Sequence, residues 1–466
     1  MIRALSIILL LALSLTLNAK AFTTIKGTVN GAHGYDIRLL TYSDQITFLE
    51  KKLATAKIDA KGNFNLIVEL HATTYAFFAI GNIRADIILE PGRAYEIRFA
   101  DYPSLSYIET RNLILQNESL GYEIIHQSGH DVNSIVVDAS VIYNNFLAEH
   151  FMDLYLKRQD VVSRFVDTFF LKYGSQQHPW IQLMVDYKIA VLKLSGYHIT
   201  MEQAWKLWLH NRDIEYHHPD FMEFFNQLFS NYLTTRQKHY TYNELKNIIN
   251  EKGSYFFLSE MMGRDTVLRN EQLRELVMIK SLGEIYHNRD FYNGSVVKIL
   301  NHIAASSKFR EHRMIASNLL FLNTRFDKGM MAPDFEFPGL DGETHSLSRY
   351  RGKYLYLAFF ASNCVPCLAE FQFLAALYPQ LNSNLEVIAI SLDPDPERFR
   401  KTMEQHQYPW PVIHFNNDFE LTTRFDIRNY PFFILISPDG AYHTYSARQP
   451  SAQFKPWFEE VVLKQN

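Results

Sequence analysis

The chain has 466 residues, of which 47% are hydrophobic and 21% are charged, and its formal net charge is -4 at pH 7. This composition is that of an ordinary globular protein and excludes a disordered or fibrous chain. The length predicts about three domains. Because no strongly basic segment offsets the slight negative charge, we expect no nucleic-acid partner.

The first 21 residues have the pattern of an export signal. Arg3 supplies a positive charge, an apolar run follows at residues 7–17, and residues 19–21 form an A-x-A cleavage pattern. The apolar run is shorter than the roughly 20 residues that a membrane span needs. We therefore predict a cleaved signal peptide at residues 1–21, a periplasmic or secreted location and no transmembrane span after cleavage. An uncleaved anchor is the alternative.

Residues 22–108 are predicted to form a β-sandwich domain, because several short alternating runs follow one another at close spacing. Two segments have the pattern of hairpins. One turns at residues 59–63 and the other at Pro91-Gly92.

Residues 109–328 are predicted to form an all-α domain, because apolar residues recur every three or four positions, as in VIYNNFLAEHFMDLYLKRQDVVSRF. His210, His217 and His218 lie close together in this region. No carboxylate or thiol at ligand spacing accompanies them, so we predict surface histidines and no metal site.

Residues 329–466 alternate between the strand and helix periods. The apolar runs at residues 354–361 and 385–392 are typical of buried parallel strands. The predicted order β-α-β-α-β-α-β-β-α, with a hairpin turn at residues 438–440, implies a mixed sheet covered on both faces. The fold class is thus multidomain, with a β-sandwich, an all-α middle domain and a C-terminal α/β domain.

The two cysteines of the chain, Cys364 and Cys367, lie where the first buried strand of this domain passes into a helix. A helix N-terminus stabilises a thiolate, and cysteine pKa values there fall to roughly 3.5–7.5. At this spacing the first sulfur faces outward and the second inward, which favours Cys364 as the attacking nucleophile and Cys367 as the resolving thiol. An inert disulfide and half of a zinc site are the alternatives. Zinc needs four ligands, and the chain has no second cysteine pair.

Two segments resemble the TlpA/ResA-type thioredoxin-like proteins, namely APDFEFPGLDGETHSLSRYRGKYLYLAFFASNCVPCLAEF and YPWPVIHFNNDFELTTRFDIRNYPFFILISPDGAY. The resemblance implies a thioredoxin-like fold and a thiol–disulfide oxidoreductase that needs no cofactor. It further implies protein disulfides as clients and a membrane or periplasmic thiol as electron donor. The upstream β domain resembles, more weakly, a domain of unknown function that often precedes such modules.

By this resemblance Cys364 and Cys367 match the redox pair. Pro431 matches a cis-proline that faces the pair and exposes the backbone of the preceding residue, Tyr430, to a client strand. Glu370 matches an acid one turn after the second cysteine, which in the family is thought to tune or deprotonate the resolving thiol. A trans proline at a strand start and an exposed helix glutamate are the alternatives for Pro431 and Glu370.

Some residues depart from the pattern of the family. Asn363 stands where tryptophan is usual, so an aromatic contact surface beside the sulfur is absent, and Tyr430 is bulky for its position. Both departures bear on the range of clients. Ala358 occupies the position of the buried acid of ordinary thioredoxin, which favours Glu370 as the group that handles the proton.

Val365-Pro366 lacks the histidine that oxidants of this fold often carry between the cysteines, so we predict a reducing or isomerising enzyme. The runner-up is a peroxiredoxin-like thiol peroxidase, but Leu357 and Ala361 occupy the proline and Ser/Thr positions of its motif. A non-catalytic binding or assembly protein with a vestigial module is a third hypothesis. The first two domains are expected to position the substrate or to mediate assembly.

Overall fold

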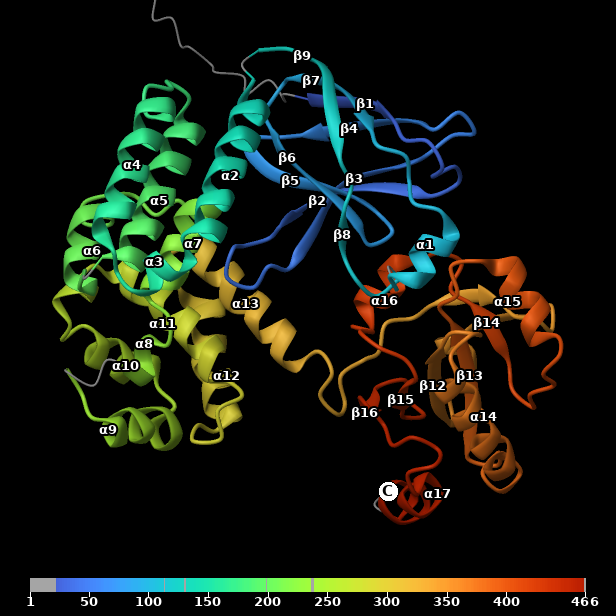
Figure 1. The fold of residues 1–466 in the computed structure, drawn as a ribbon. Coiled ribbons are helices and arrows are strands. Elements are labelled where there is room, and N and C mark those ends of the chain that lie inside the picture. Colours follow the sequence, from blue (N-terminus) through green and yellow to red (C-terminus); the bar gives the residue numbers. More distant parts are fainter. Residues whose placement is uncertain (1–21, 113, 130, 198, 236–238, 465–466) are drawn as a thin grey trace, which may run out of the picture.

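The computed structural model describes residues 22–112, 114–129, 131–197, 199–235 and 239–464. The predicted signal peptide at residues 1–21 lies outside the described residues. Along the chain, an N-terminal part rich in strands is followed by a group of helices and then by a C-terminal α/β part (Figure 1). Within the described ranges, no helix is both long enough and apolar enough to cross a membrane.

The strands of the N-terminal part form two sheets. The four-stranded sheet has the order β4-β1-β7-β9 and consists of β1 (Phe22–Thr28), β4 (Asn63–Glu69), β7 (Ala94–Phe99) and β9 (Tyr122–Gln127). The five-stranded sheet has the order β3-β2-β5-β6-β8 and consists of β2 (Asp36–Tyr42), β3 (Glu50–Lys57), β5 (Thr74–Ile80), β6 (Ile83–Leu89) and β8 (Glu118–Ser119). Alternate residues of β4 and β7 are buried, and side chains of both sheets, such as Ile25, Phe78 and Ile97, belong to one buried cluster.

Both predicted hairpins are wrong in their pairing. The chain does turn at residues 59–63, where the N–H of Asp59 donates to the carbonyl of Asn63 at 3.0 Å. However, β3 pairs with β2, whereas β4 pairs with β1. The strands on either side of Pro91-Gly92, β6 and β7, also lie in different sheets. Turn residues reverse the chain, but burial of the apolar face decides which strand becomes the neighbour.

The strands extend beyond residue 108, although the sequence predicted helices there. A short helix, α1 (Leu105–Thr110), comes first. β8 then pairs in parallel with β6, and β9 pairs antiparallel with β7. β9 is a short edge strand in which none of the side chains is buried, so its assignment depends on the partner strand rather than on its own apolar pattern.

The middle of the chain is helical, as predicted. Its helices are α2 (Val132–Glu149), α3 (Phe151–Tyr155), α4 (Gln159–Tyr173), α5 (Pro179–Gly196), α6 (Met201–Trp208), α7 (Pro219–Leu228), α8 (Tyr232–Thr235), α9 (Tyr242–Lys246), a π-helical turn (Asn247–Lys252), α10 (Tyr255–Met262), a 3-10 turn (Thr266–Leu268), α11 (Glu271–Ile285), α12 (Asn293–Ser306) and α13 (Arg310–Thr324). The side-chain amide of Asn133, at the start of α2, donates to the carbonyl of Ile88 at 2.9 Å and accepts from its N–H at 2.8 Å, which fixes α2 to β6.

The prediction of surface histidines is wrong for His218. This side chain is buried, and its Nε2 lies 3.1 Å from the carbonyl oxygen of Trp180. Burial lowers its pKa, with a smaller opposing effect from Asp220. The residue sits at the start of α7, where the helix packs on α5, so its place in the core depends on packing that the local sequence does not reveal.

The C-terminal part has a thioredoxin-like fold, and it confirms the predicted order of strands and helices. The sheet order is β14-β13-β12-β15-β16, built from β12 (Tyr354–Phe360), β13 (Leu385–Ser391), β14 (Val412–His414), β15 (Phe432–Ile436) and β16 (Tyr442–Thr444). The helices are α14 (Val365–Leu377), α15 (Pro396–Met403), α16 (Phe419–Arg424) and α17 (Phe454–Trp457), with 3-10 turns at Leu347–Tyr350 and Tyr378–Gln380 and a π-helical turn at Phe458–Leu463. A hairpin of β10 (Glu336–Pro338) and β11 (Thr344–Ser346), which the sequence did not predict, precedes the sheet.

Both faces of this sheet are covered. Leu357 and Phe359 of β12 belong to one buried cluster, and Tyr356 and Phe360 belong to another. Successive residues of a strand point to opposite faces, so a central strand covered on both sides is apolar throughout. This explains the continuous apolar run from which the strand was predicted.

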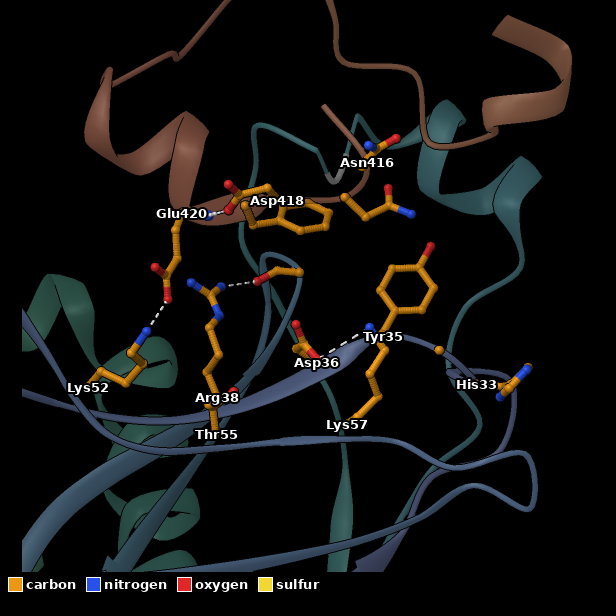
Figure 2. A pocket seen from close by; sticks show the side chains of 14 residues that line it. His33, Tyr35, Asp36, Arg38, Lys52, Thr55, Lys57, Asn416, Asp418 and Glu420 are labelled. Atoms are coloured by element: carbon orange, nitrogen blue, oxygen red, sulfur yellow. Dashed lines mark hydrogen bonds and ion pairs between the residues drawn. The ribbon is translucent and has the colours of Figure 1, made fainter. Parts of the chain in front are cut away.

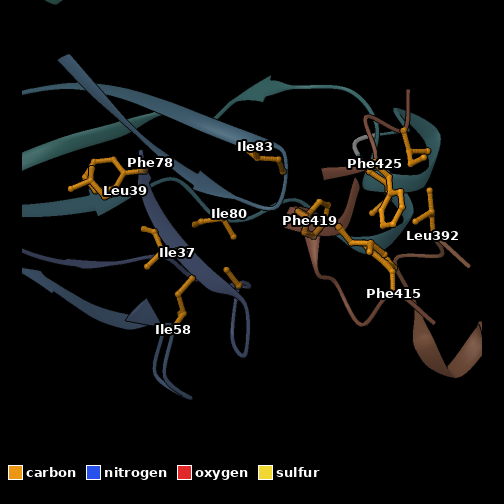
Figure 3. Close-up of a cluster of buried hydrophobic side chains, with 14 of the residues drawn as sticks. Ile37, Leu39, Ile58, Phe78, Ile80, Ile83, Leu392, Phe415, Phe419 and Phe425 are labelled. Carbon is orange, nitrogen blue, oxygen red and sulfur yellow. The ribbon is translucent and has the colours of Figure 1, made fainter. Parts of the chain in front are cut away.

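The N-terminal part packs directly against the C-terminal part. The buried cluster that contains Ile37 and Ile80 also contains Phe415 and Phe419, and Figure 3 shows these side chains facing one another. Gly81, in the turn between β5 and β6, has a φ of 61°, and a Cβ there would lie 2.9 Å from the ring of Phe419. The absence of a side chain at Gly81 therefore lets the two parts come into contact.

Candidate active site

Cys364 and Cys367 form a disulfide at the start of α14, with an S–S distance of 2.07 Å. Cys364 is the N-cap of this helix, and its sulfur accepts a hydrogen bond from the N–H of Cys367 at 3.1 Å. Cys367 is fully buried, whereas Cys364 is half-buried and the neighbouring Val365 is 76% exposed. One sulfur thus faces the surface and the other the core, as the spacing predicted.

The sequence of α14 explains why the pair lies at its first turn. Pro366 occupies the first turn of the helix, where a missing N–H breaks no helical hydrogen bond. Cys367, Phe371 and Leu374 are the buried residues of α14 and recur at helical spacing, so one face of the helix lies against the sheet. That arrangement leaves Cys364 on the outer side of the helix start, where the N-terminal end of the helix dipole favours a thiolate.

A buried carboxylate holds the loop that precedes Cys364. Asp393, two residues after the end of β13, accepts a hydrogen bond from the N–H of Ser362 at 2.9 Å and from its hydroxyl at 2.7 Å. The hydroxyl of Ser391 also donates to Asp393. Sequence analysis missed this group. The available signal was an aspartate directly after a buried parallel strand, at the sheet edge where sites of α/β folds collect.

Arg398 of α15 joins this carboxylate to the N-terminal part. Its guanidinium lies 3.8 Å from Asp393 and donates to the carboxylate of Glu109 at 2.6 Å. Glu109 belongs to α1, 289 residues earlier in the chain. A continuous series of polar contacts therefore runs from Ser362, beside the disulfide, to a helix of the N-terminal part.

The Tyr430–Pro431 peptide bond is cis, which is the configuration implied by the resemblance. Both residues are half-buried and directly precede β15, whose Phe432 is paired with Phe359 of β12. The hydroxyl of Tyr430 donates to the side-chain oxygen of Asn112 at 3.4 Å. Burial raises the pKa of Tyr430, and the negative charges of Asp393 and Glu109 add to this effect.

Glu370 is half-buried on α14, and its carboxylate is bound to the segment that precedes α17. It accepts a hydrogen bond from the N–H of Ser451 at 3.0 Å and from the Ser451 hydroxyl at 2.6 Å. Burial raises the pKa of Tyr356, and the charge of Glu370 contributes to that shift. The structure thus shows Ser451 as a partner of Glu370, and a part for Glu370 in proton transfer remains a prediction.

A polar cavity of about 490 Å³ lies at the same interface between the two parts (Figure 2). In it, Lys52 donates to Glu420 at 2.6 Å, and the guanidinium of Arg38 donates to the carbonyl of Gly81 at 2.8 Å. Burial lowers the pKa of Arg38. Lys52 and Lys57 pair with the carboxylates of Glu420 and Asp36, and the lining of the cavity contains no cysteine.

Comparison with known proteins places the same part of the chain among redox proteins. The family model described as AhpC/TSA family matches residues 329–443. Thiol-disulfide oxidoreductase ResA of Oceanobacillus iheyensis is 30% identical over 158 residues, which are 33% of this chain and 78% of that protein. Peroxiredoxin Bcp of Bacillus subtilis is 32% identical over 101 residues, 21% of this chain and 63% of that protein.

A solved structure of a thiol-disulfide oxidoreductase from Bacteroides fragilis is 29% identical in sequence. The match covers 28% of this chain and 99% of that one, with a TM-score of 0.25.

Proposed function

Because this chain belongs, through its C-terminal part, to the ResA family of thiol-disulfide oxidoreductases, we propose that it exchanges disulfides with client proteins through Cys364 and Cys367. The strongest support for the proposal is the different burial of the two bonded sulfurs. The sulfur of Cys364 is half-buried at a helix start, and the sulfur bonded to it is fully buried. This is the arrangement of one attacking and one resolving thiol.

In the proposed reaction the reduced enzyme attacks first. The Cys364 thiolate attacks one sulfur of the client disulfide, a mixed disulfide forms, and the other client sulfur leaves as a thiolate. Cys367 then loses its proton and attacks the Cys364 sulfur, so the client leaves with both sulfurs reduced and the Cys364–Cys367 disulfide forms. An external thiol donor, a membrane or periplasmic protein, returns two electrons to that disulfide.

Further residues are proposed to act in these steps. The backbone of Tyr430, held in place by Pro431, pairs with the client strand while the sulfurs meet. Glu370, one turn after Cys367, receives the proton of the resolving thiol. Its carboxylate is held in place by hydrogen bonds from the N–H and the hydroxyl of Ser451.

Replacing Cys367 with alanine is expected to trap clients as mixed disulfides on Cys364, since the second attack cannot occur. The measurement is non-reducing electrophoresis of the purified variant after incubation with reduced and denatured, then reoxidised, proteins, followed by mass spectrometry of the linked cysteine. The variant lacking both sulfurs is the control. The absence of any mixed disulfide on Cys364 would contradict the mechanism.

The direction of electron flow is proposed to be reducing or isomerising, because Val365-Pro366 brings no positive charge between the cysteines to stabilise the thiolate. An equilibrium titration against glutathione is expected to give a reduction potential well below about -150 mV, the strongly oxidising end of this class. A potential above that value would show an oxidant instead.

Peroxide reduction is the second candidate function, favoured by the AhpC/TSA match and by the similarity to peroxiredoxin Bcp. Leu357 and Ala361 stand where the peroxiredoxin motif has proline and Ser/Thr, which argues against it. Rapid consumption of hydrogen peroxide by the reduced protein would establish this function.

The export signal, the periplasmic or secreted location and the division into domains at residues 22–108, 109–328 and 329–466 are also proposals. Two observations bear on the division. Both N-terminal sheets contribute to one buried cluster, which supports a β-sandwich. The pairing of β9 with β7 favours a first boundary after Gln127 rather than after residue 108.

A further inference from the structure

We propose that residues 105–112 of the N-terminal part, here called the α1 wall, form one side of the client-binding surface and favour clients with an apolar residue next to the attacked cysteine. The inference rests on the proposed function, because it assigns the substrate preference of the same disulfide site. The partner is an extended segment of an oxidised polypeptide.

One face of the α1 wall is directed toward the C-terminal part. Leu105, Ile108 and Glu109 have the i, i+3, i+4 spacing of residues on one side of a helix, and Asn112 follows the end of the helix with a φ of 52°. Ile108 is buried in the cluster shared with the C-terminal part, Glu109 binds Arg398, and Asn112 accepts from the Tyr430 hydroxyl. Figure 1 shows α1 beside α15 and α16.

The α1 wall is attached on both sides of the redox site. On one side Asn112 contacts Tyr430, whose backbone is the proposed pairing edge for the client. On the other side Glu109 reaches, through Arg398 and Asp393, to Ser362. Ser362 precedes Cys364 by two residues, and two residues of chain span at most about 7 Å. A strand paired with Tyr430 therefore passes close to this helix.

The exposed side chain of Leu105 gives the α1 wall an apolar surface that a client can contact. It is 43% exposed although it lies on the face that the helix turns toward the C-terminal part. Beside the sulfur of Cys364 the C-terminal part exposes Asn363 and Val365. Burying apolar surface between Leu105, Val365 and a client side chain is favourable by roughly 25 cal/mol per Å².

The test compares two disulfide-bonded peptides that differ only in leucine or serine beside the cysteine, with oxidised glutathione as a third substrate. For the wild type we expect a higher kcat/KM for the leucine peptide. Leu105→Glu introduces a charge at an exposed position. In this variant the ratio of kcat/KM for the leucine peptide to kcat/KM for the serine peptide is expected to fall about tenfold. The matched control is Ile67→Glu on β4, where the isoleucine is 56% exposed, and it is expected to keep the wild-type ratio.

A second pair of variants tests the attachment of the helix. Glu109→Gln removes the ion pair with Arg398. It is expected to lower the ratio of the kcat/KM values for the leucine and serine peptides, because α1 loses one of its contacts with the C-terminal part. Glu420→Gln removes another ion pair between the same two parts, that with Lys52 at 2.6 Å, and should leave this ratio unchanged.

Two results would contradict the proposal that the α1 wall binds clients. One is a wild-type enzyme with equal kcat/KM values for both peptides. The other is a Leu105→Glu variant that slows both peptides and oxidised glutathione by the same factor, since that would place the effect on the chemistry rather than on the client. A wild-type protein that reduces none of the three disulfides would refute the proposed function itself, and therefore also the proposed role of the α1 wall.

Discussion

Replacing Cys364 with serine is expected to reduce the insulin-reducing activity of the protein to the rate of dithiothreitol alone, a fall of at least about a thousandfold. The hydroxyl of serine is not ionised at neutral pH, and its oxygen cannot form the mixed disulfide through which the client is released. The sulfur of Cys367 cannot replace it, because that side chain is fully buried behind the first turn of α14. The measurement is the turbidity of reduced insulin over time.

The matched control is Ala369→Ser, which places a serine on an exposed residue of the same helix and leaves both sulfurs in place. This variant is expected to keep most of the wild-type rate. Circular dichroism spectra should agree among all three proteins, since the disulfide closes only a short loop within one helical turn. Equal rates for Cys364→Ser and the wild type would favour a binding protein with a vestigial module over an enzyme.

Much of the C-terminal part could be predicted because its information is local. The apolar run of β12 shows a strand buried on both faces, and the cysteines directly after it mark the helix start. The roles of Tyr430 and Pro431 came from the resemblance alone, since nothing in their immediate sequence distinguishes a cis bond.

The failures share a different cause. The partner of β3 and the partner of β4 are chosen by the packing of two sheets, and the turn between the strands is compatible with either arrangement. The contact between Glu109 and Arg398 joins residues 289 positions apart. Neither residue has a local pattern that differs from an ordinary surface charge. Features that depend on how separate parts of the chain meet are therefore absent from the sequence analysis, and in this protein they include the contact of α1 with the C-terminal part.

Replacing Asp393 with alanine is expected to lower the free energy of unfolding by about 3 kcal/mol. The substitution removes the acceptor of the Ser362 N–H, the Ser362 hydroxyl and the Ser391 hydroxyl, and a buried polar group left without a partner costs roughly 1–3 kcal/mol. Arg398 keeps its bond to Glu109, so part of the network survives. The measurement is urea unfolding followed by circular dichroism.

The control is Asp395→Ala, two residues further along the chain. Asp395 caps α15 from the surface side and accepts from the N–H of Glu397 at 3.0 Å. Loss of such a cap costs about 1 kcal/mol, so the two alanine variants should differ clearly. Equal losses of the free energy of unfolding in the two variants would show that the buried Asp393 stabilises the protein no more than the helix cap Asp395.

Asp393→Ala is also expected to change the rate of disulfide reduction, because the carboxylate of Asp393 holds Ser362, which precedes Cys364 by two residues. With Ser362 released, the Cys364 sulfur is no longer fixed relative to Tyr430, and a misplacement of about 1 Å can lower a rate a hundredfold. The variant should therefore reduce oxidised glutathione more slowly at temperatures where it is fully folded, while Asp395→Ala should not. Asp393→Asn, which keeps one acceptor oxygen for Ser362, should fall between them, and this order would identify the anchoring of the loop, rather than stability alone, as the contribution of Asp393.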